Sequence, residues 1–235
     1  MYRFQSKVRF SEIDENKKLS IASIVDYFQD TSTMQSEELG AGMEYLESLG
    51  QVWVMSYWQI VVERCPVLNE RISVGTFPYD FKSFMGLRNF FMEDASGEMI
   101  IKANSIWTLM DLNAGRPVKP SADMLSKYQL EPKQDMENAP RKIFPAGEAT
   151  RMPEFVVTRQ HLDSNHHVNN GQYIHMAMEY LPEGFEVRQM RAEYRKSALL
   201  HDIIVPEVYM QDDIVCVSLN NSEGQPFTLI EVTKR

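Results

Sequence analysis

The chain has 235 residues, of which 43% are hydrophobic, and its formal net charge is -9. This length and apolar content allow one large or two small packed domains and argue against global disorder. The acidic balance argues against a nucleic-acid-binding protein that works through a broad basic surface. The first residues lack the apolar stretch of a signal peptide, and no apolar run approaches the roughly 18 residues of a membrane span, so we expect a cytoplasmic protein.

The first predicted helix begins near residue 21, and several strands follow it. Four apolar side chains repeat with the i, i+3, i+4, i+7 spacing of a buried helix face, namely Ile21, Ile24, Val25 and Phe28. Segments rich in β-branched and aromatic residues then predict an antiparallel meander. These segments cover 52–64, 70–77, 84–94 and 98–110.

A proline-rich stretch divides the chain. Six of the eleven prolines lie between positions 117 and 153, where no helical or strand period is clear. This composition predicts a linker over 117–153, with a short helix near 121–128. The flanking segments, 1–116 and 154–235, are each long enough to form a domain.

The segment after the linker repeats the pattern of the first half. Asp163 and Asn165 precede the second predicted helix as Asp14 and Asn16 precede the first. The buried face of this second helix is predicted to consist of Tyr173, Met176, Ala177 and Tyr180. Four strand-like segments follow, over 185–197, 203–211, 213–219 and 226–233.

One apolar helix beside several antiparallel strands predicts an α+β fold in which the sheet wraps around a central helix, called a hotdog fold. The repeat predicts two such domains in tandem. A single helix on a single sheet buries limited area in a unit of roughly 100 residues. Pairing two units, within one chain or between chains, solves that problem, so both a monomer and a homodimer are compatible with the sequence.

A polar cluster immediately before the second helix contains the candidate chemistry. Four of the five histidines gather there, namely His161, His166, His167 and His175. A helix start offers unpaired backbone N–H groups and a partial positive charge, which can stabilise a developing oxyanion. Asp163 could attack a carbonyl carbon or orient a base, His167 could activate water, and Asn165 could position water or the carbonyl.

Other interpretations of this cluster stay open. Asn and Asp favour helix N-caps whatever their function, and the first half keeps Asp14 while Lys17 and Lys18 replace both histidines. Asp-x-Asn can therefore belong to the fold, and the histidines distinguish the second copy. A metal site is disfavoured because no His-x3-His pair with a helical Glu is present. Cys216 lies in an apolar strand-like run, where a buried thiol is expected. We expect neither a metal nor a cofactor.

At these residues the sequence resembles the fatty acyl-ACP thioesterases, a family that includes plant plastid enzymes and bacterial relatives. Its motif reads Asp-x-Asn-x-His-Val-Asn-Asn, with a Tyr three residues further on. The matching residues are Asp163, Asn165, His167, Val168, Asn169, Asn170 and Tyr173. The family has two tandem hotdog repeats, and the resemblance implies catalytic roles for Asp163, Asn165 and His167. Asn169 and Asn170 are possible supporting residues.

The sequence departs from the plant pattern after Glu193-Tyr194-Arg195. The plant enzymes continue there with a basic residue, Glu and Cys, whereas this chain has Lys196, Ser197 and Ala198. A thiol nucleophile at that place is therefore excluded, and Ser197 replaces a carboxylate that would help to position water. Glu193 shares strand parity with Ser197 and could substitute through a water. A structural glutamate on the sheet surface is the alternative.

The resemblance implies a fatty acyl chain on the phosphopantetheine arm of acyl carrier protein (ACP), hydrolysed to free fatty acid during fatty acid biosynthesis. It also implies an acyl pocket shaped by the first half, for which the candidates are Phe28, Met34, Trp53, Met55 and Trp58. Plain core packing explains these residues equally well.

Carrier proteins are acidic, so docking would need a local positive patch. The candidates for such a patch are Arg141 with Lys142, and Arg188, Arg191, Arg195 and Lys196. An acyl-CoA thioesterase of the same fold and a non-catalytic module that binds acyl thioesters are the alternative functions. A hotdog hydratase is disfavoured because the proline of its Asp-x-Asn-Pro-x-His pattern is missing.

Overall fold

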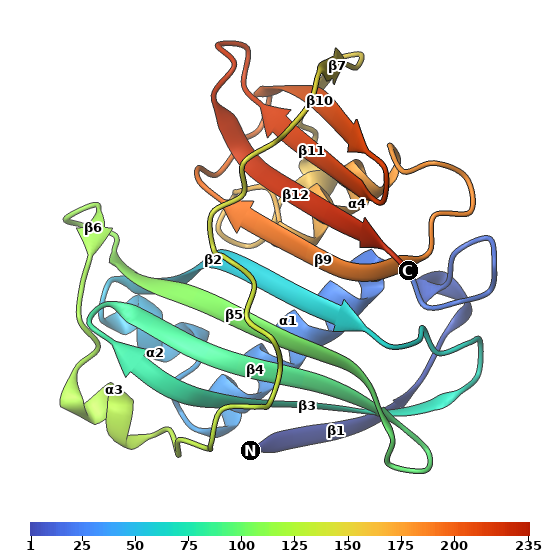
Figure 1. Ribbon diagram of the computed structural model, residues 1–235. Helices are drawn as coiled ribbons and strands as arrows, with labels where there is room; N and C mark the ends of the chain where they lie inside the picture. Colours follow the sequence, from blue (N-terminus) through green and yellow to red (C-terminus); the bar gives the residue numbers. More distant parts are fainter. The chain divides into compact units, whose positions relative to one another are not determined.

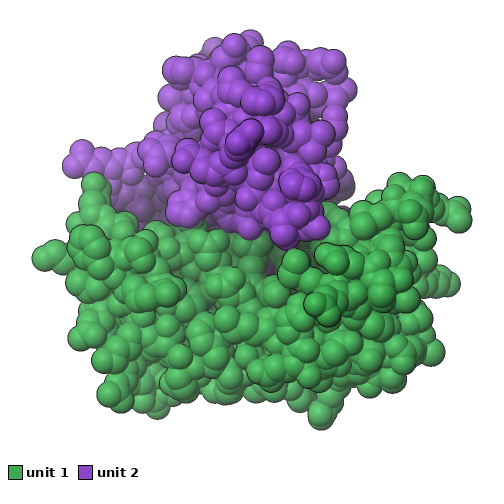
Figure 2. Space-filling view, turned by 180° about the vertical axis from the view of Figure 1, so that it is seen from behind, with its two compact units in different colours: residues 1–56, 62–137 green, residues 57–61, 138–235 purple.

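The computed structural model describes all 235 residues, which divide into two compact units. Unit 1 comprises Met1–Ser56 and Val62–Glu137, and unit 2 comprises Tyr57–Val61 and Asn138–Arg235 (Figure 2). The division splits the expected linker between the units, and it also places Tyr57–Val61 of the first half in unit 2. None of the helices combines the length and apolar character that a membrane span requires.

Unit 1 is an antiparallel sheet packed on one long helix (Figure 1). Its strands neighbour one another in the order β1-β3-β4-β5, and the first half of β2 belongs to the same unit. The elements are β1 (Tyr2–Lys7), α1 (Ile21–Glu38), α2 (Met43–Ser48), β2 (Gln51–Val62), β3 (Arg71–Lys82), β4 (Met85–Asp94), β5 (Met99–Asp111), β6 (Arg116–Pro117) and α3 (Ala122–Ser126).

Helix α1 forms because a cap and an apolar face coincide. The Ser20 hydroxyl accepts a hydrogen bond from the Ser23 N–H (3.1 Å), which satisfies one of the unpaired amides of the first turn. Ile24 and Phe28 are fully buried, and the Phe28 ring lies 5.2 Å from that of Phe90 on β4. The buried face then turns polar toward the end of the helix, where Gln35 is also buried.

Unit 2 repeats this arrangement with a shorter helix. Its strands neighbour one another in the order β2-β9-β12-β11-β10-β7, where β2 contributes Tyr57–Val61. Helix α4 (Asn170–Met178) packs against β11 and β12 and buries Tyr173 and Ala177. The strands are β7 (Ala149–Arg151), β8 (Phe155–Val156), β9 (Val187–Tyr194), β10 (Ile203–Gln211), β11 (Ile214–Asn220) and β12 (Pro226–Lys234).

Each unit is therefore an antiparallel sheet with a central helix, which confirms the expected α+β fold of two hotdog units. The short helix expected near 121–128 is α3. One strand differs from expectation, because β9 ends at Tyr194 and does not continue to 197. The N–H groups of Arg195 and Lys196 both donate to the carbonyl of Phe227 (2.9 and 3.2 Å), so the regular pairing stops there.

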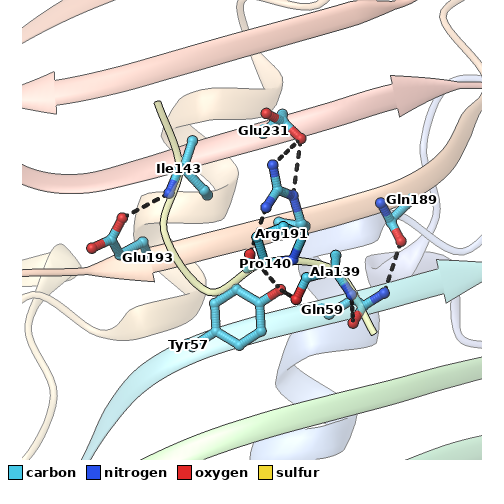
Figure 3. A network of polar contacts seen from close by, with 9 residues as sticks. All are labelled: Tyr57, Gln59, Ala139, Pro140, Ile143, Gln189, Arg191, Glu193 and Glu231. Atoms are coloured by element: carbon cyan, nitrogen blue, oxygen red, sulfur yellow. Dashed lines mark hydrogen bonds and ion pairs between the residues drawn. The ribbon is translucent and has the colours of Figure 1, made fainter. Parts of the chain in front are cut away.

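A strap, defined as residues 139–143, crosses the face of the unit 2 sheet that is opposite to α4 (Figure 3). The Tyr57 hydroxyl lies within hydrogen-bond reach of the carbonyl of Pro140 (3.3 Å). Arg191 donates to the same carbonyl (2.6 Å) and forms an ion pair with Glu231 (2.5 Å). One end of the strap is thus held by side chains of β2 and β9.

Glu193 holds the other end of the strap. Its side chain is 3% exposed, and its carboxylate accepts the Ile143 N–H (3.0 Å) and pairs with Lys142 (2.9 Å) and Arg195 (3.2 Å). Burial raises the pKa of Glu193, but the hydrogen bonds from Arg195, Ile143 and Lys142 outweigh burial and hold the pKa below its ordinary value. Because the folded-state pKa is depressed, this carboxylate stabilises the fold at neutral pH and loses that effect as the pH falls through the folded pKa.

We expect Glu193→Gln to lower the free energy of unfolding at pH 7 by about 1–3 kcal/mol, because a charged acceptor of three donors is lost. The loss should shrink as the pH is lowered through the folded-state pKa of Glu193, because the wild-type carboxyl group then also becomes neutral. Urea unfolding followed by circular dichroism at pH 7 and at a series of lower pH values measures this difference. Glu223→Gln, in an exposed turn, is the matched control. A destabilisation by Glu193→Gln that does not depend on pH would contradict the assignment.

Candidate active site

Asp163 organises a tight turn between a short 3-10 helix, Arg159–His161, and α4. Its Oδ1 atom accepts the backbone N–H groups of Asn165 (2.8 Å) and His167 (3.2 Å). The N–H of Asp163 donates in return to the carbonyl of His167 (2.8 Å). These bonds place Asp163, Asn165 and His167 in one turn, and they leave Oδ2 of Asp163 without a hydrogen bond to the protein.

Unit 1 contains the same turn without the histidines. Oδ1 of Asp14 accepts the N–H groups of Asn16 (2.9 Å) and Lys18 (3.0 Å), and the N–H of Asp14 donates to the carbonyl of Lys18 (2.8 Å). The third residue after the aspartate has a left-handed backbone in both copies, with φ 60 at Lys17 and at His166. The turn is therefore a requirement of the fold, and it explains the aspartate without any catalytic role.

The fold does not account for the side chain of His167 in the same way. His167 and Asn165 are both exposed, and neither side chain makes a hydrogen bond within the protein. The backbone of His167 is fixed on one side by Asp163 and on the other by a bridge to Leu199. An imidazole and a carboxamide on a rigid backbone are thus open to a ligand.

His161 has a structural role. Its Nδ1 atom accepts the Thr158 N–H (3.0 Å), as the Glu12 carboxylate accepts the Arg9 N–H (2.7 Å) in unit 1. It serves as a cap of the short helix before the turn. His166 is exposed, and its left-handed backbone continues the turn.

Two of the backbone amides at the start of α4, where an oxyanion site was expected, already make hydrogen bonds within the protein. Oδ1 of Asn169 caps the helix by accepting the Gly171 N–H (2.8 Å), and the Asn169 N–H donates to the carbonyl of His161 (2.9 Å). Both amides are therefore already used. The carbonyl of Asn170 accepts the Tyr194 hydroxyl (3.1 Å). Asn169 and the backbone of Asn170 thus hold the helix start in place.

A second segment supports the turn from the side of Ser197. The Ala198 N–H donates to the Tyr173 hydroxyl (2.8 Å), and the Val168 N–H donates to the carbonyl of Ala198 (3.0 Å). Burial raises the pKa of Tyr173, so this hydroxyl stays protonated. Ser197 is half-buried, and its hydroxyl makes no hydrogen bond within the protein. The motif tyrosine therefore ties Ser197 and its neighbours to the catalytic candidates, a role that sequence reasoning missed.

Glu193 does not join this group, contrary to the parity argument. That argument assumed a strand through Ser197, but β9 ends at Tyr194. The Glu193 side chain lies on the strap side of the sheet, and both its oxygens are used by Lys142, Ile143 and Arg195 (Figure 3). Glu193 therefore does not supply the carboxylate that the plant enzymes have at the position of Ser197.

A cysteine nucleophile and a metal site are both disfavoured by the surroundings of the residues that would form them. Burial raises the pKa of the Cys216 thiol to about 12, so very little thiolate is present at neutral pH. No group of three His, Cys, Asp or Glu side chains is placed to hold a metal ion.

The expected pocket and docking residues are only partly available to a ligand. Of the expected pocket residues, Met34 is 41% exposed and so does not line an interior, whereas Phe28 and Met55 are buried. Of the expected docking residues, Arg191 is paired with Glu231, and Arg195 is paired with Glu193.

Comparison with known families matches both units. The acyl-ACP thioesterase N-terminal domain matches residues 1–128, and the acyl-ACP thioesterase C-terminal domain matches residues 146–226. Oleoyl-acyl carrier protein thioesterase 1 of Arabidopsis thaliana is 22% identical over 228 residues, which are 86% of this chain and 62% of that protein. The palmitoyl-acyl carrier protein thioesterase of the same plant is 24% identical over 213 residues, which are 83% of this chain and 52% of that protein. The chain therefore spans little more than half the length of these relatives.

Solved structures share the fold. The acyl-ACP thioesterase from Bacteroides thetaiotaomicron has a TM-score of 0.91 at 19% identity, with 99% of this chain and 97% of that chain covered. The 12:0-ACP thioesterase from Umbellularia californica has a TM-score of 0.86 at 17% identity, with 100% of this chain and 96% of that chain covered. Because the N-terminal family model alone matches more than half of the sequence, the chain belongs to the acyl-ACP thioesterase family.

Proposed function

We propose that this protein is a thioester hydrolase that releases free fatty acid from fatty acyl-ACP in fatty acid biosynthesis. Its family membership supports the reaction class. The observation that carries the assignment of the site is the pair of identical turns around Asp14 and Asp163. The fold explains the aspartate in both turns, but it does not explain why only the second carries an exposed imidazole at His167.

In the proposed reaction, His167 takes a proton from water as the water oxygen attacks the thioester carbonyl carbon. The carbon–sulfur bond then breaks, and the leaving thiolate takes the proton from the imidazolium. Asn165 can donate a hydrogen bond from its carboxamide to the carbonyl oxygen. Two N–H groups already bind Oδ1 of Asp163, so its free Oδ2 is better suited to orient water than to attack.

The similar proteins with related sequences are named as thioesterases of acyl carrier protein, which supports ACP as the carrier. We expect one acyl group to be released faster from ACP than from CoA. Parallel assays of thiol release at equal thioester concentration measure the two rates. A clear preference for CoA would favour an acyl-CoA thioesterase. Tight binding of both thioesters without thiol release would show that the protein is an acyl-binding module.

The repeated turn supplies a matched pair of variants. Asp163→Ala and Asp14→Ala each remove the acceptor of two backbone N–H groups, so each should cost about 1–2 kcal/mol of folding free energy. Only Asp163→Ala should reduce thiol release, by roughly 100-fold or more. Asp163→Asn retains a side-chain oxygen that can hold the turn, and it should be inactive although folded.

Thiol-release kinetics and urea unfolding of these variants measure both effects. Equal losses of activity in Asp163→Ala and Asp14→Ala would reduce Asp163 to a structural residue. Normal turnover by Asp163→Asn would show that its negative charge has no part in the reaction.

A further inference from the structure

Ser197 and His167 lie on one face of a short antiparallel pairing in unit 2. His167 forms a β-bridge with Leu199, and the Val168 N–H donates to the carbonyl of Ala198 (3.0 Å). Side chains alternate across such a pairing, so Ser197 and Leu199 share the side of His167. Val168 and Ala198 point to the other side, where both are buried. The exposure of His167 and Leu199 and the half-buried state of Ser197 agree with this assignment.

The two polar side chains on this face have no partner within the protein. Neither the Ser197 hydroxyl nor the His167 imidazole makes a hydrogen bond to another residue. Residues placed diagonally across an antiparallel pairing, as these two are, have α carbons about 7–8 Å apart. One water molecule can bridge polar side chains at such a spacing.

Neighbouring residues fix the backbone beside Ser197. The Tyr173 hydroxyl, on a side chain that is 2% exposed, accepts the Ala198 N–H (2.8 Å). The Asp202 carboxylate accepts the Leu199 N–H (2.8 Å). The hydroxyl of Ser197 therefore sits on a rigid backbone without being used to hold it.

The corresponding position in unit 1 has no hydroxyl. There the Leu19 N–H donates to the carbonyl of Pro66 (2.8 Å), which is the counterpart of the bond to Ala198. Cys65 is therefore the counterpart of Ser197. The fold accepts a residue without a hydroxyl at this place, and the copy that carries the imidazole is the one that carries the serine.

We infer that Ser197 is a further catalytic residue, whose hydroxyl donates a hydrogen bond to the water that attacks the thioester. This role rests on the proposed hydrolysis. The water gives one hydrogen to His167 and directs the other to Oδ2 of Asp163, while one of its lone pairs accepts the Ser197 O–H. The remaining lone pair then points at the carbonyl carbon. As the new carbon–oxygen bond forms, His167 takes the first proton and Ser197 keeps its own.

A serine nucleophile is the competing role for the same hydroxyl. A nucleophilic serine needs its base within hydrogen-bond reach. Ser197 makes no hydrogen bond to His167, and the diagonal placement of the two residues leaves room for a water between them. The geometry therefore favours a hydroxyl that holds water over one that attacks.

The test is steady-state hydrolysis of the fatty acyl-ACP that the wild-type protein cleaves fastest. Ser197→Ala should lower kcat by at least about tenfold and change KM by less than about twofold, because the hydroxyl contacts the water and not the thioester. Ser197→Thr retains a hydroxyl and should keep kcat within about threefold of the wild type. Cys65→Ala, at the matched position in unit 1, should leave both constants unchanged.

Circular dichroism establishes that each variant is folded. Near-normal kcat in folded Ser197→Ala would overturn the inference while leaving the proposed hydrolysis intact. Absence of thiol release by the wild-type protein would defeat both. Mass spectrometry of the intact protein during turnover should show no acyl adduct, and an acyl group attached to Ser197 would replace the water-holding role by a nucleophilic one.

Discussion

The hydrogen bonds from the N–H groups of Asn165 and His167 to Oδ1 of Asp163 are the interaction on which the rest of the site depends. They close the turn that presents the imidazole and the carboxamide at the start of α4. The Asn169 cap fixes the turn to the helix, and Tyr173 fixes it to the segment after β9. The same turn in unit 1 lacks the imidazole. The proposed active site is thus a structural element of the fold with different side chains mounted on it.

The two faces of the unit 2 sheet have different roles, and the alternation of side chains along β9 separates them. Tyr194 points to the α4 side, where its hydroxyl donates to the Asn170 carbonyl. Arg191 and Glu193 point to the opposite side, where they hold the strap (Figure 3). Adjacent residues in the Glu193-Tyr194 pair therefore serve stability and site geometry respectively, which a linear motif does not distinguish.

Local sequence signals predicted much of this fold. The spacing of Ile24 and Phe28 identified α1, and the motif around His167 identified the turn before α4. Long-range contacts were not predictable. Glu193 is paired with Lys142, fifty-one positions away in sequence, and the face that Ser197 shares with His167 depends on the bridge between His167 and Leu199. The end of β9 was also missed, because it depends on the carbonyl of Phe227 on another strand.

The central claim is that His167, and not the turn itself, supplies the chemistry. Steady-state thiol release from a fatty acyl-ACP by His167→Ala tests it most directly, with His166→Ala as the neighbouring control. Circular dichroism should show that both variants are folded, because neither imidazole makes a hydrogen bond within the protein. We expect roughly 100-fold or greater loss of turnover for His167→Ala and near-normal turnover for His166→Ala. Near-normal turnover by folded His167→Ala would contradict the account.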